Sequence, residues 1–130
     1  MSSQARPGAV IYAKNIALVS AFYTGVFGFE VTHSEDAHVV LESPLFQLII
    51  VAIPANIAAS IELASPPIRR SDTPIKLAFF VASIRAARAA ASRLGGELNG
   101  ADREWQFDGW TVCDGHDPEG NVVQFREIAC

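Results

Sequence analysis

Apolar residues along this chain mostly alternate with polar ones or form short runs, but at two places they change to a helical spacing. The first is the segment from Asn15 to Phe27, where apolar side chains recur every three or four residues. That period is typical of an amphipathic helix with one face on a core. Asn15 is a favourable N-cap, and Gly28 is suited to end the helix in a left-handed conformation.

Runs of β-branched and apolar residues around this helix predict strands. The predicted strands of the first half are Gly8–Lys14, Phe29–Ser34, Ala37–Glu42 and Leu45–Ile53. The last run is almost entirely apolar, so we expect that strand to be buried on both faces. Residues 55–73 are less regular and contain Pro66-Pro67, so they are predicted to be a surface linker, with room for a short helix or strand.

The same order of elements then returns. The elements predicted for the second half are a strand over Pro74–Val81, a helix over Ile84–Leu94 that is capped by Ser83 and ended by Gly95-Gly96, a strand starting at Glu97–Asn99, a strand from Trp110 to His116 after a turn at Asp108-Gly109, and a last strand over Val122–Ile128. The helix cap Asn15 and the helix-ending Gly28 both map onto this half with an offset of about 68 residues, to Ser83 and Gly96. The sequence therefore predicts one α+β domain, residues 1–130, built from βαβββ modules at 8–54 and 74–128.

The segment from Asp117 to Asn121 carries strong turn chemistry. Pro118 disfavours helix in the residue before it, and Gly120-Asn121 accepts the positive φ angles of a tight turn. A hairpin is therefore predicted here, leading into the last strand.

Composition narrows the class of function. The net charge is −4 and the pI is near 5.2, which argues against a nucleic-acid partner because such proteins need a basic patch. The two cysteines form neither a disulfide framework nor a zinc motif. The longest apolar run is too short to span a membrane, so a cytoplasmic protein without a membrane partner is predicted.

The duplicated βαβββ pattern, Phe22-Tyr23 with Val26–Phe29 around the end of the first helix, and Asp117–Asn121 before the last strand resemble the vicinal oxygen chelate superfamily. This superfamily includes glyoxalase I, extradiol dioxygenases and bleomycin-resistance proteins. The resemblance implies two modules that form an incomplete, U-shaped barrel around a ligand cavity, and a homodimer. It also implies that any metal ligands come from the first and last strands of each module.

Carried over to this chain, the metal positions fall on Gly8, Gln47, Lys76 and Gln124. Glycine offers no side-chain ligand, lysine is a cation with donors only, and neutral amides are weak ligands beside imidazole or carboxylate. We therefore expect no metal at the usual place and no cofactor. Because these four residues differ from the superfamily's usual metal ligands, the metal-dependent reactions of the superfamily are not expected for this chain.

Several side chains remain as candidates for binding a ligand. Strand alternation places Lys76 on the cavity face, where it either holds an anion or extends to water. Arg126 shares the face of Gln124 and would reinforce an anion site. The aromatic candidates are Tyr12, Phe80, Trp105 and Trp110, which suit either a pocket wall or ordinary core packing.

The three histidines allow different interpretations. His33 and His38 flank the predicted turn at Glu35-Asp36, where they either bind a metal adventitiously or are solvated loop residues. His116 lies just before the Asp117 turn and suits a turn-stabilising role or an acid–base role.

Three functions are compatible with these residues. The first is a metal-free small-molecule-binding protein of the glyoxalase/bleomycin-resistance type that sequesters a small aromatic or anionic ligand. The alternative is a lyase, isomerase or dioxygenase of the same superfamily with an atypical metal site that includes Gln47, Gln124 and a histidine from elsewhere in the chain. The third is a structural partner domain, which would have a filled interior and a large exposed apolar patch.

Overall fold

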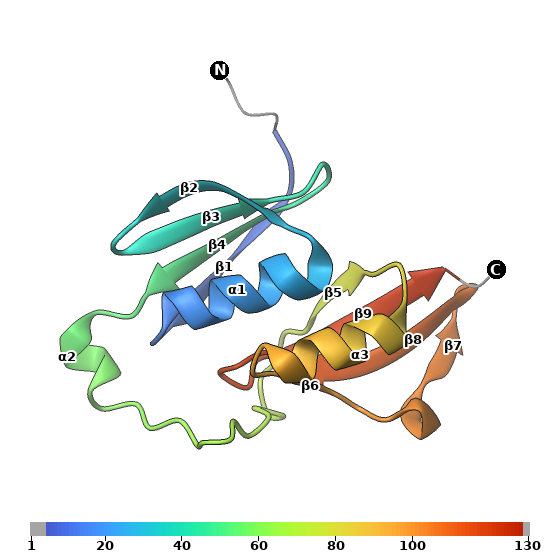
Figure 1. The fold of residues 1–130 in the computed structure, drawn as a ribbon. Helices are drawn as coiled ribbons and strands as arrows, with labels where there is room; N and C mark the ends of the chain where they lie inside the picture. Colours follow the sequence, from blue (N-terminus) through green and yellow to red (C-terminus); the bar gives the residue numbers. More distant parts are fainter. Residues whose placement is uncertain (1–4, 129–130) are drawn as a thin grey trace.

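The computed structural model describes residues 5–128 (Figure 1). The first module contains β1 (Gly8–Ala13), α1 (Ile16–Phe27), β2 (Glu30–Glu35), β3 (His38–Glu42) and β4 (Gln47–Ala52). Its four strands form the first sheet in the order β1-β4-β3-β2. β1 and β4 are parallel, whereas the other neighbours are antiparallel.

The second module repeats this plan with additions. It contains β5 (Leu77–Phe80), α3 (Ile84–Arg93), β6 (Glu97–Leu98), a 3-10 turn (Ala101–Arg103), β7 (Trp105–Phe107), β8 (Trp110–His116) and β9 (Val122–Ile128). The second sheet has the order β5-β9-β8-β6, and β7 also pairs with β8. The α+β class with two βαβββ modules is therefore confirmed, and the two sheets do not close into a barrel.

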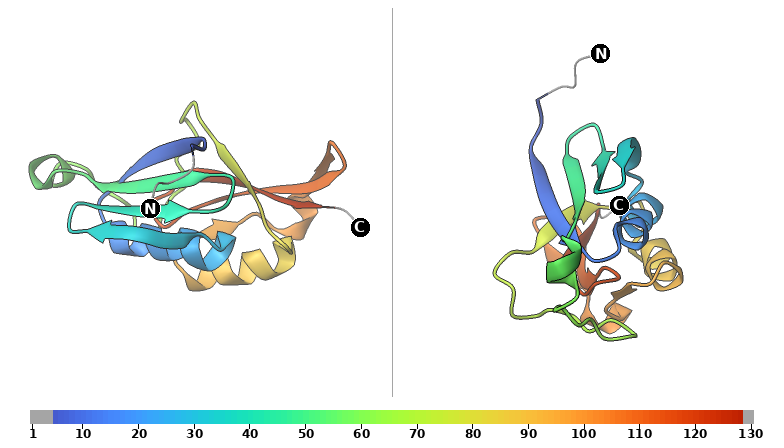
Figure 2. Two further views of the ribbon diagram at one scale, coloured as in Figure 1. Left: turned by 90° about the horizontal axis from the view of Figure 1, so that it is seen from above. Right: turned by 90° about the vertical axis from the view of Figure 1, so that its left-hand side faces the viewer.

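The two modules share one hydrophobic core. Helices α1 and α3 lie side by side against the sheets (Figure 2). Phe27 of α1 stacks on Phe125 of β9 with ring centroids 4.7 Å apart, and Tyr23 of α1 meets Phe79 of β5 edge-on at 6.4 Å. Because these aromatic contacts join the first helix to the second sheet, the modules are packed as one unit.

Capping residues explain where the helices begin and end. Asn15 accepts a hydrogen bond from the Leu18 N–H (3.0 Å), and Ser83 accepts one from the Ala86 N–H (3.1 Å). Gly28 ends α1 with φ 77°, as predicted. In the second module, however, the left-handed residue is Gly95 (φ 93°) and not Gly96. The offset of 68 residues therefore holds for the helix caps but is one residue too long for the helix ends.

The segment between the modules is mostly irregular, with one short helix, α2 (Ala55–Ala58). The Lys14 ammonium donates to the Ile61 carbonyl and fastens this segment to the end of β1. The first strand of the second module is shorter than predicted, because regular pairing begins at Leu77 and leaves Pro74–Lys76 outside it.

One strand is less buried than its sequence predicted. In β4, Leu48 and Ile50 are fully buried, but Ile49 and Val51 on the opposite face are only half-buried. The prediction of burial on both faces is wrong for the single chain, because α1 covers only one side of the first sheet. Apolar residues on the other side are left partly uncovered.

Among residues 5–128, the structure contains no helix that is both long enough and apolar enough to cross a membrane.

Candidate functional site

Each sheet turns one face toward the helices and leaves the other, here called its open face, without a helix. On the first sheet the open face is mostly exposed or half-buried, while the residues between its members face the core. Its members on β1 and β4 are Gly8, Val10, Tyr12, Gln47, Ile49 and Val51. Tyr12 is 64% exposed, so its ring is available to a ligand or to another chain.

The first module places its superfamily metal positions next to each other. Gly8 lies directly opposite Gln47 on the parallel pair β1 and β4. The Gln47 side-chain amide donates to the Glu42 carboxylate (3.1 Å), which also lies 3.8 Å from the Arg6 guanidinium. Glu42 was not among the predicted site residues, because its proximity depends on the pairing of β3 with β4.

In the second module, the residue opposite Gln124 on the neighbouring strand differs from the predicted one. Gln124 lies opposite Ala78 on β5, and not opposite Lys76 as the repeat offset implied. Lys76 precedes the strand, and its ammonium pairs with Asp114 of β8 at 2.9 Å. Asp114 in turn lies directly across from Gln124. Sequence reasoning missed this carboxylate, which neutralises the lysine that was predicted either to hold an anion or to extend to water.

Aromatic side chains gather around Arg126 on the open face of the second sheet. Phe80 meets Trp110 edge-on at 4.8 Å, and Phe107 lies 6.1 Å from Trp110. The Arg126 guanidinium carbon lies 5.0 Å from the Trp110 ring centroid and 5.7 Å from that of Phe107, which is cation–π distance. Its Nε donates to the Oε1 atom of the Gln124 side chain at 2.7 Å. We call Phe80, Phe107, Trp110, Gln124 and Arg126 the aromatic–arginine cluster.

Trp105 lies beside this cluster on the same open face. It pairs with Val112, while Phe107 pairs with Trp110 across the β7–β8 hairpin. The hairpin turns at Asp108-Gly109, both with positive φ (52° and 83°), as the sequence predicted. Phe107 lies two residues after Trp105 along β7, so strand alternation places both rings on this face.

Hollows in the surface do not bring all the predicted residues together. A groove of about 490 Å³ is lined by Tyr12, Tyr23, Arg70, Ile75 and Asn121 among others, between β1 and the start of β5. A second, of about 390 Å³, includes Phe80. Tyr12 and Gln47 are thus on one sheet, and the remaining predicted residues are on or beside the other. Their roles in binding stay predictions.

The turn at Asp117–Asn121 joins the modules through two buried carboxylates. Asp117 is fully buried and accepts hydrogen bonds from the Tyr23 hydroxyl (2.9 Å), the N–H groups of Glu119 and Asn121, and the Asn121 side chain. Burial raises the pKa of Asp117 above its ordinary value, although these donors oppose the rise. Burial and the neighbouring Asp117 raise the pKa of Tyr23 well above its usual value, which keeps the phenol protonated as a donor.

Glu119 makes the second connection. Its carboxylate, only 3% exposed, accepts from the backbone N–H groups of Lys14 (3.0 Å) and Asn15 (2.8 Å), where α1 begins. The favourable interaction of an anion with a helix N-terminus adds to these bonds. His116, also buried, holds its Nδ1 2.9 Å from the Asp117 carbonyl, which agrees with the turn-stabilising interpretation of this histidine.

The donor set at the four superfamily positions does not fit a divalent metal. Gly8 contributes no side chain, Ala78 stands opposite Gln124, and the two glutamines are neutral amides. The nearby carboxylates are already engaged, Glu42 with Gln47 and Arg6, and Asp114 with Lys76. His33 and His38 lie on β2 and β3, on either side of the hairpin turn, as the predicted strands placed them.

Comparison with known proteins places this geometry in a family. The model of the glyoxalase-like domain matches residues 8–125. A glyoxalase/bleomycin resistance protein/dioxygenase family enzyme from Burkholderia phytofirmans PsJN is 22% identical, with TM-score 0.69 over 94% of this chain and 97% of that one. A glyoxalase/bleomycin resistance protein from Albidiferax ferrireducens T118 is 16% identical, with TM-score 0.67 over 95% and 98%.

A bleomycin-binding protein in complex with bleomycin is also similar, at 16% identity and TM-score 0.58, over 98% of this chain and the whole of that one. At these identities the solved structures support the fold. No match was found among curated proteins.

Proposed function

Because the chain belongs to the glyoxalase-like domain family, we propose that it binds a small aromatic or anionic molecule on the open face of the second sheet, without a metal at the superfamily's usual positions. A ligand here would stack on the indole of Trp110 and interact with the Arg126 guanidinium. Gln124 would supply a hydrogen bond. Small-molecule sites commonly combine aromatic walls with a few polar groups in this way.

The observation that supports this proposal most is the exposure of the aromatic–arginine cluster. Phe107 is 53% exposed and Phe80 45% exposed, although large aromatic rings are usually covered. Arg126 is held over two rings by its contacts with Trp110 and Phe107 and by its bond to Gln124. A planar anion would meet a guanidinium that is already oriented, which lowers the entropic cost of binding.

A second copy of the chain would complete this site. The open faces of both sheets carry exposed apolar residues, with Tyr12 and Val10 on the first and Phe80 and Phe107 on the second. Exposed apolar patches of this kind favour association. We propose a homodimer in which these faces meet, so that Tyr12 and Gln47 of one chain approach the aromatic–arginine cluster of the other.

The homodimer predicts a measurable mass. Sedimentation velocity at micromolar concentration is expected to give a species of about twice the 14.0 kDa chain mass. Tyr12→Asp, which places a charge on the open face without touching the core, is expected to shift the protein toward monomer. A wild-type protein that sediments as a monomer at every concentration would contradict the proposed dimer.

The ligand site predicts a loss of affinity when Trp110 is truncated. A calorimetric screen of small aromatic carboxylates and bleomycin would identify a binding probe. For that probe, Trp110→Ala is expected to weaken binding roughly 30-fold, since a central aromatic residue contributes about 2 kcal/mol. Ile57→Ala, at an exposed apolar residue on α2 away from the cluster, is the matched control and should leave affinity unchanged.

The charge preference is tested on the same probe. Arg126→Gln should weaken an aromatic carboxylate more than its neutral amide analogue, because it removes the cation and keeps a polar side chain. Equal affinities of wild type, Trp110→Ala and Arg126→Gln would show that the ligand binds elsewhere.

A further inference from the structure

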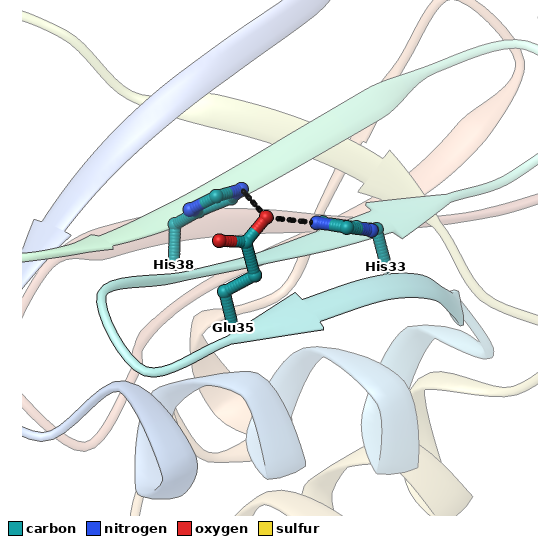
Figure 3. Close-up of side chains that lie close together, drawn as sticks. All are labelled: His33, Glu35 and His38. Atoms are coloured by element: carbon teal, nitrogen blue, oxygen red, sulfur yellow. Dashed lines mark hydrogen bonds and ion pairs between the residues drawn. The ribbon is translucent and has the colours of Figure 1, made fainter.

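Two histidines and a glutamate, none of which belongs to the ligand site proposed above, converge on the β2–β3 hairpin (Figure 3). The Nε2 atom of His33 lies 2.5 Å from the Oε2 atom of Glu35, and the Nε2 atom of His38 lies 4.0 Å from that same oxygen. The His33 and His38 ring centroids are 5.4 Å apart. One ligand atom from each residue lies within 4.8 Å of the other two.

The pairing of the hairpin strands creates this convergence. Glu35 lies directly opposite His38, and His33 lies opposite Val40. Residues two apart on a strand share a face, so His33 and Glu35 point the same way, and His38 joins them from the neighbouring strand. A register shift between Val31 and His33 sets this alternation, as β-bulges do when they redirect side chains.

We propose that His33 Nε2, His38 Nε2 and the Glu35 carboxylate form a binding site for a divalent transition-metal ion such as Zn²⁺. Two imidazoles and one carboxylate are a ligand set that zinc accepts, with a further position left for water or another ligand. Ligand atoms of a tetrahedral zinc ion lie about 3.3 Å apart, as follows from metal–ligand distances of about 2.0–2.2 Å. The distances of 2.5 and 4.0 Å bracket that value.

The three side chains are free to make the small adjustment that coordination needs. The side chains of His33 and Glu35 are 53% and 59% exposed and that of His38 is 34% exposed, so the core does not fix their rotamers. Both imidazoles already direct Nε2 at the same carboxylate oxygen (Figure 3).

The location separates this site from the superfamily's metal positions. His38 lies opposite Val51, which lies opposite Tyr12, so the ion would sit on the open face of the first sheet. Gln47 lies at the other end of β4, four residues before Val51. The proposed ion is therefore bound by one hairpin and requires neither Gln47 nor Gln124.

Isothermal titration of tag-free protein with Zn²⁺ tests the proposal. We expect one ion per chain for wild type, and a loss of about a hundredfold in affinity for His33→Ala, His38→Ala and Glu35→Gln. Removing a partner that only orients a ligand already costs about 10–100-fold, and a direct ligand should cost no less. Asp36→Asn changes a carboxylate in the same hairpin that is outside the converging group, and should bind Zn²⁺ as wild type does.

Histidine ¹⁵N NMR supplies a second, independent readout. The chain has three histidines, and Zn²⁺ should shift the Nε2 resonances of His33 and His38 while those of buried His116 stay unchanged. The substituted residues are partly or fully exposed, so circular dichroism should show folded variants. Zn²⁺ affinity that survives in both His38→Ala and Glu35→Gln, or shifts confined to His116, would overturn the proposal.

Discussion

Asp117→Ala is expected to lower the free energy of unfolding by about 3 kcal/mol, measured by urea denaturation. The substitution leaves the Tyr23 hydroxyl and two backbone N–H groups without their acceptor inside the protein. Each buried polar group that loses its partner costs roughly 1–3 kcal/mol. The substitution also removes a carboxylate that is itself costly to bury, and this gain offsets part of the loss. We therefore expect a total below the sum of the costs of the three unpaired groups.

Two further variants separate the contributions of the individual Asp117 hydrogen bonds to stability. Tyr23→Phe removes one hydrogen bond and should cost about 1 kcal/mol. Asp117→Asn keeps an acceptor for the two backbone N–H groups but faces the Asn121 amide with a second donor, so an intermediate loss is expected. If Asp117→Ala were no more harmful than Tyr23→Phe, the carboxylate would not be holding the turn to α1.

The Asp117 turn also shows how far sequence alone reaches. The Pro, Gly and Asn residues predict the turn, and Gly120 indeed has φ 86°. The same residues do not reveal that Asp117 binds Tyr23 or that Glu119 binds the start of α1, because those partners lie 94 and about 105 residues away in the chain. Local chemistry fixes a turn, whereas its partners depend on how the modules pack.

Side-chain faces were predicted well where strands are regular. Alternation placed Phe80, Gln124 and Arg126 on one face, and the structure agrees. The strands predicted at Phe29–Ser34 and Ala37–Glu42 contain His33 and His38, but β2 continues through Glu35 and a register shift precedes His33. Nothing in the sequence marks that shift, so the register that brings Glu35 opposite His38 was not predicted.

Lys76 illustrates a different limit. Its face was predicted from the strand period, but its partner Asp114 was not, because the two residues approach each other through the strand order β5-β9-β8 of the second sheet. Of the two alternatives for Lys76, an anion site and a side chain extended to water, neither included the ion pair that the structure has. Arg126, whose guanidinium lies over aromatic rings, is the more available cation on this face.

Phe125→Ala is expected to be the most damaging of the substitutions considered, with a loss of about 3–5 kcal/mol in the free energy of unfolding. Phe125 is fully buried in β9 and stacks on Phe27 of α1, so the cavity would open at the contact between the modules. A small domain has only about 5–15 kcal/mol of stability to lose. Urea unfolding at 25 °C, followed by circular dichroism, measures the change.

Phe80→Ala is the matched control, since it removes the same side chain from the neighbouring strand on the opposite face of the sheet. Phe80 is 45% exposed and packs edge-on against Trp110, so its loss should cost about 1 kcal/mol or less. The ligand that Trp110 binds should nevertheless bind more weakly to this variant. A large loss of stability only in Phe125→Ala, with weaker ligand binding in Phe80→Ala, would separate the shared core from the binding face. Similar losses of stability in both variants would mean that the open face is part of the core.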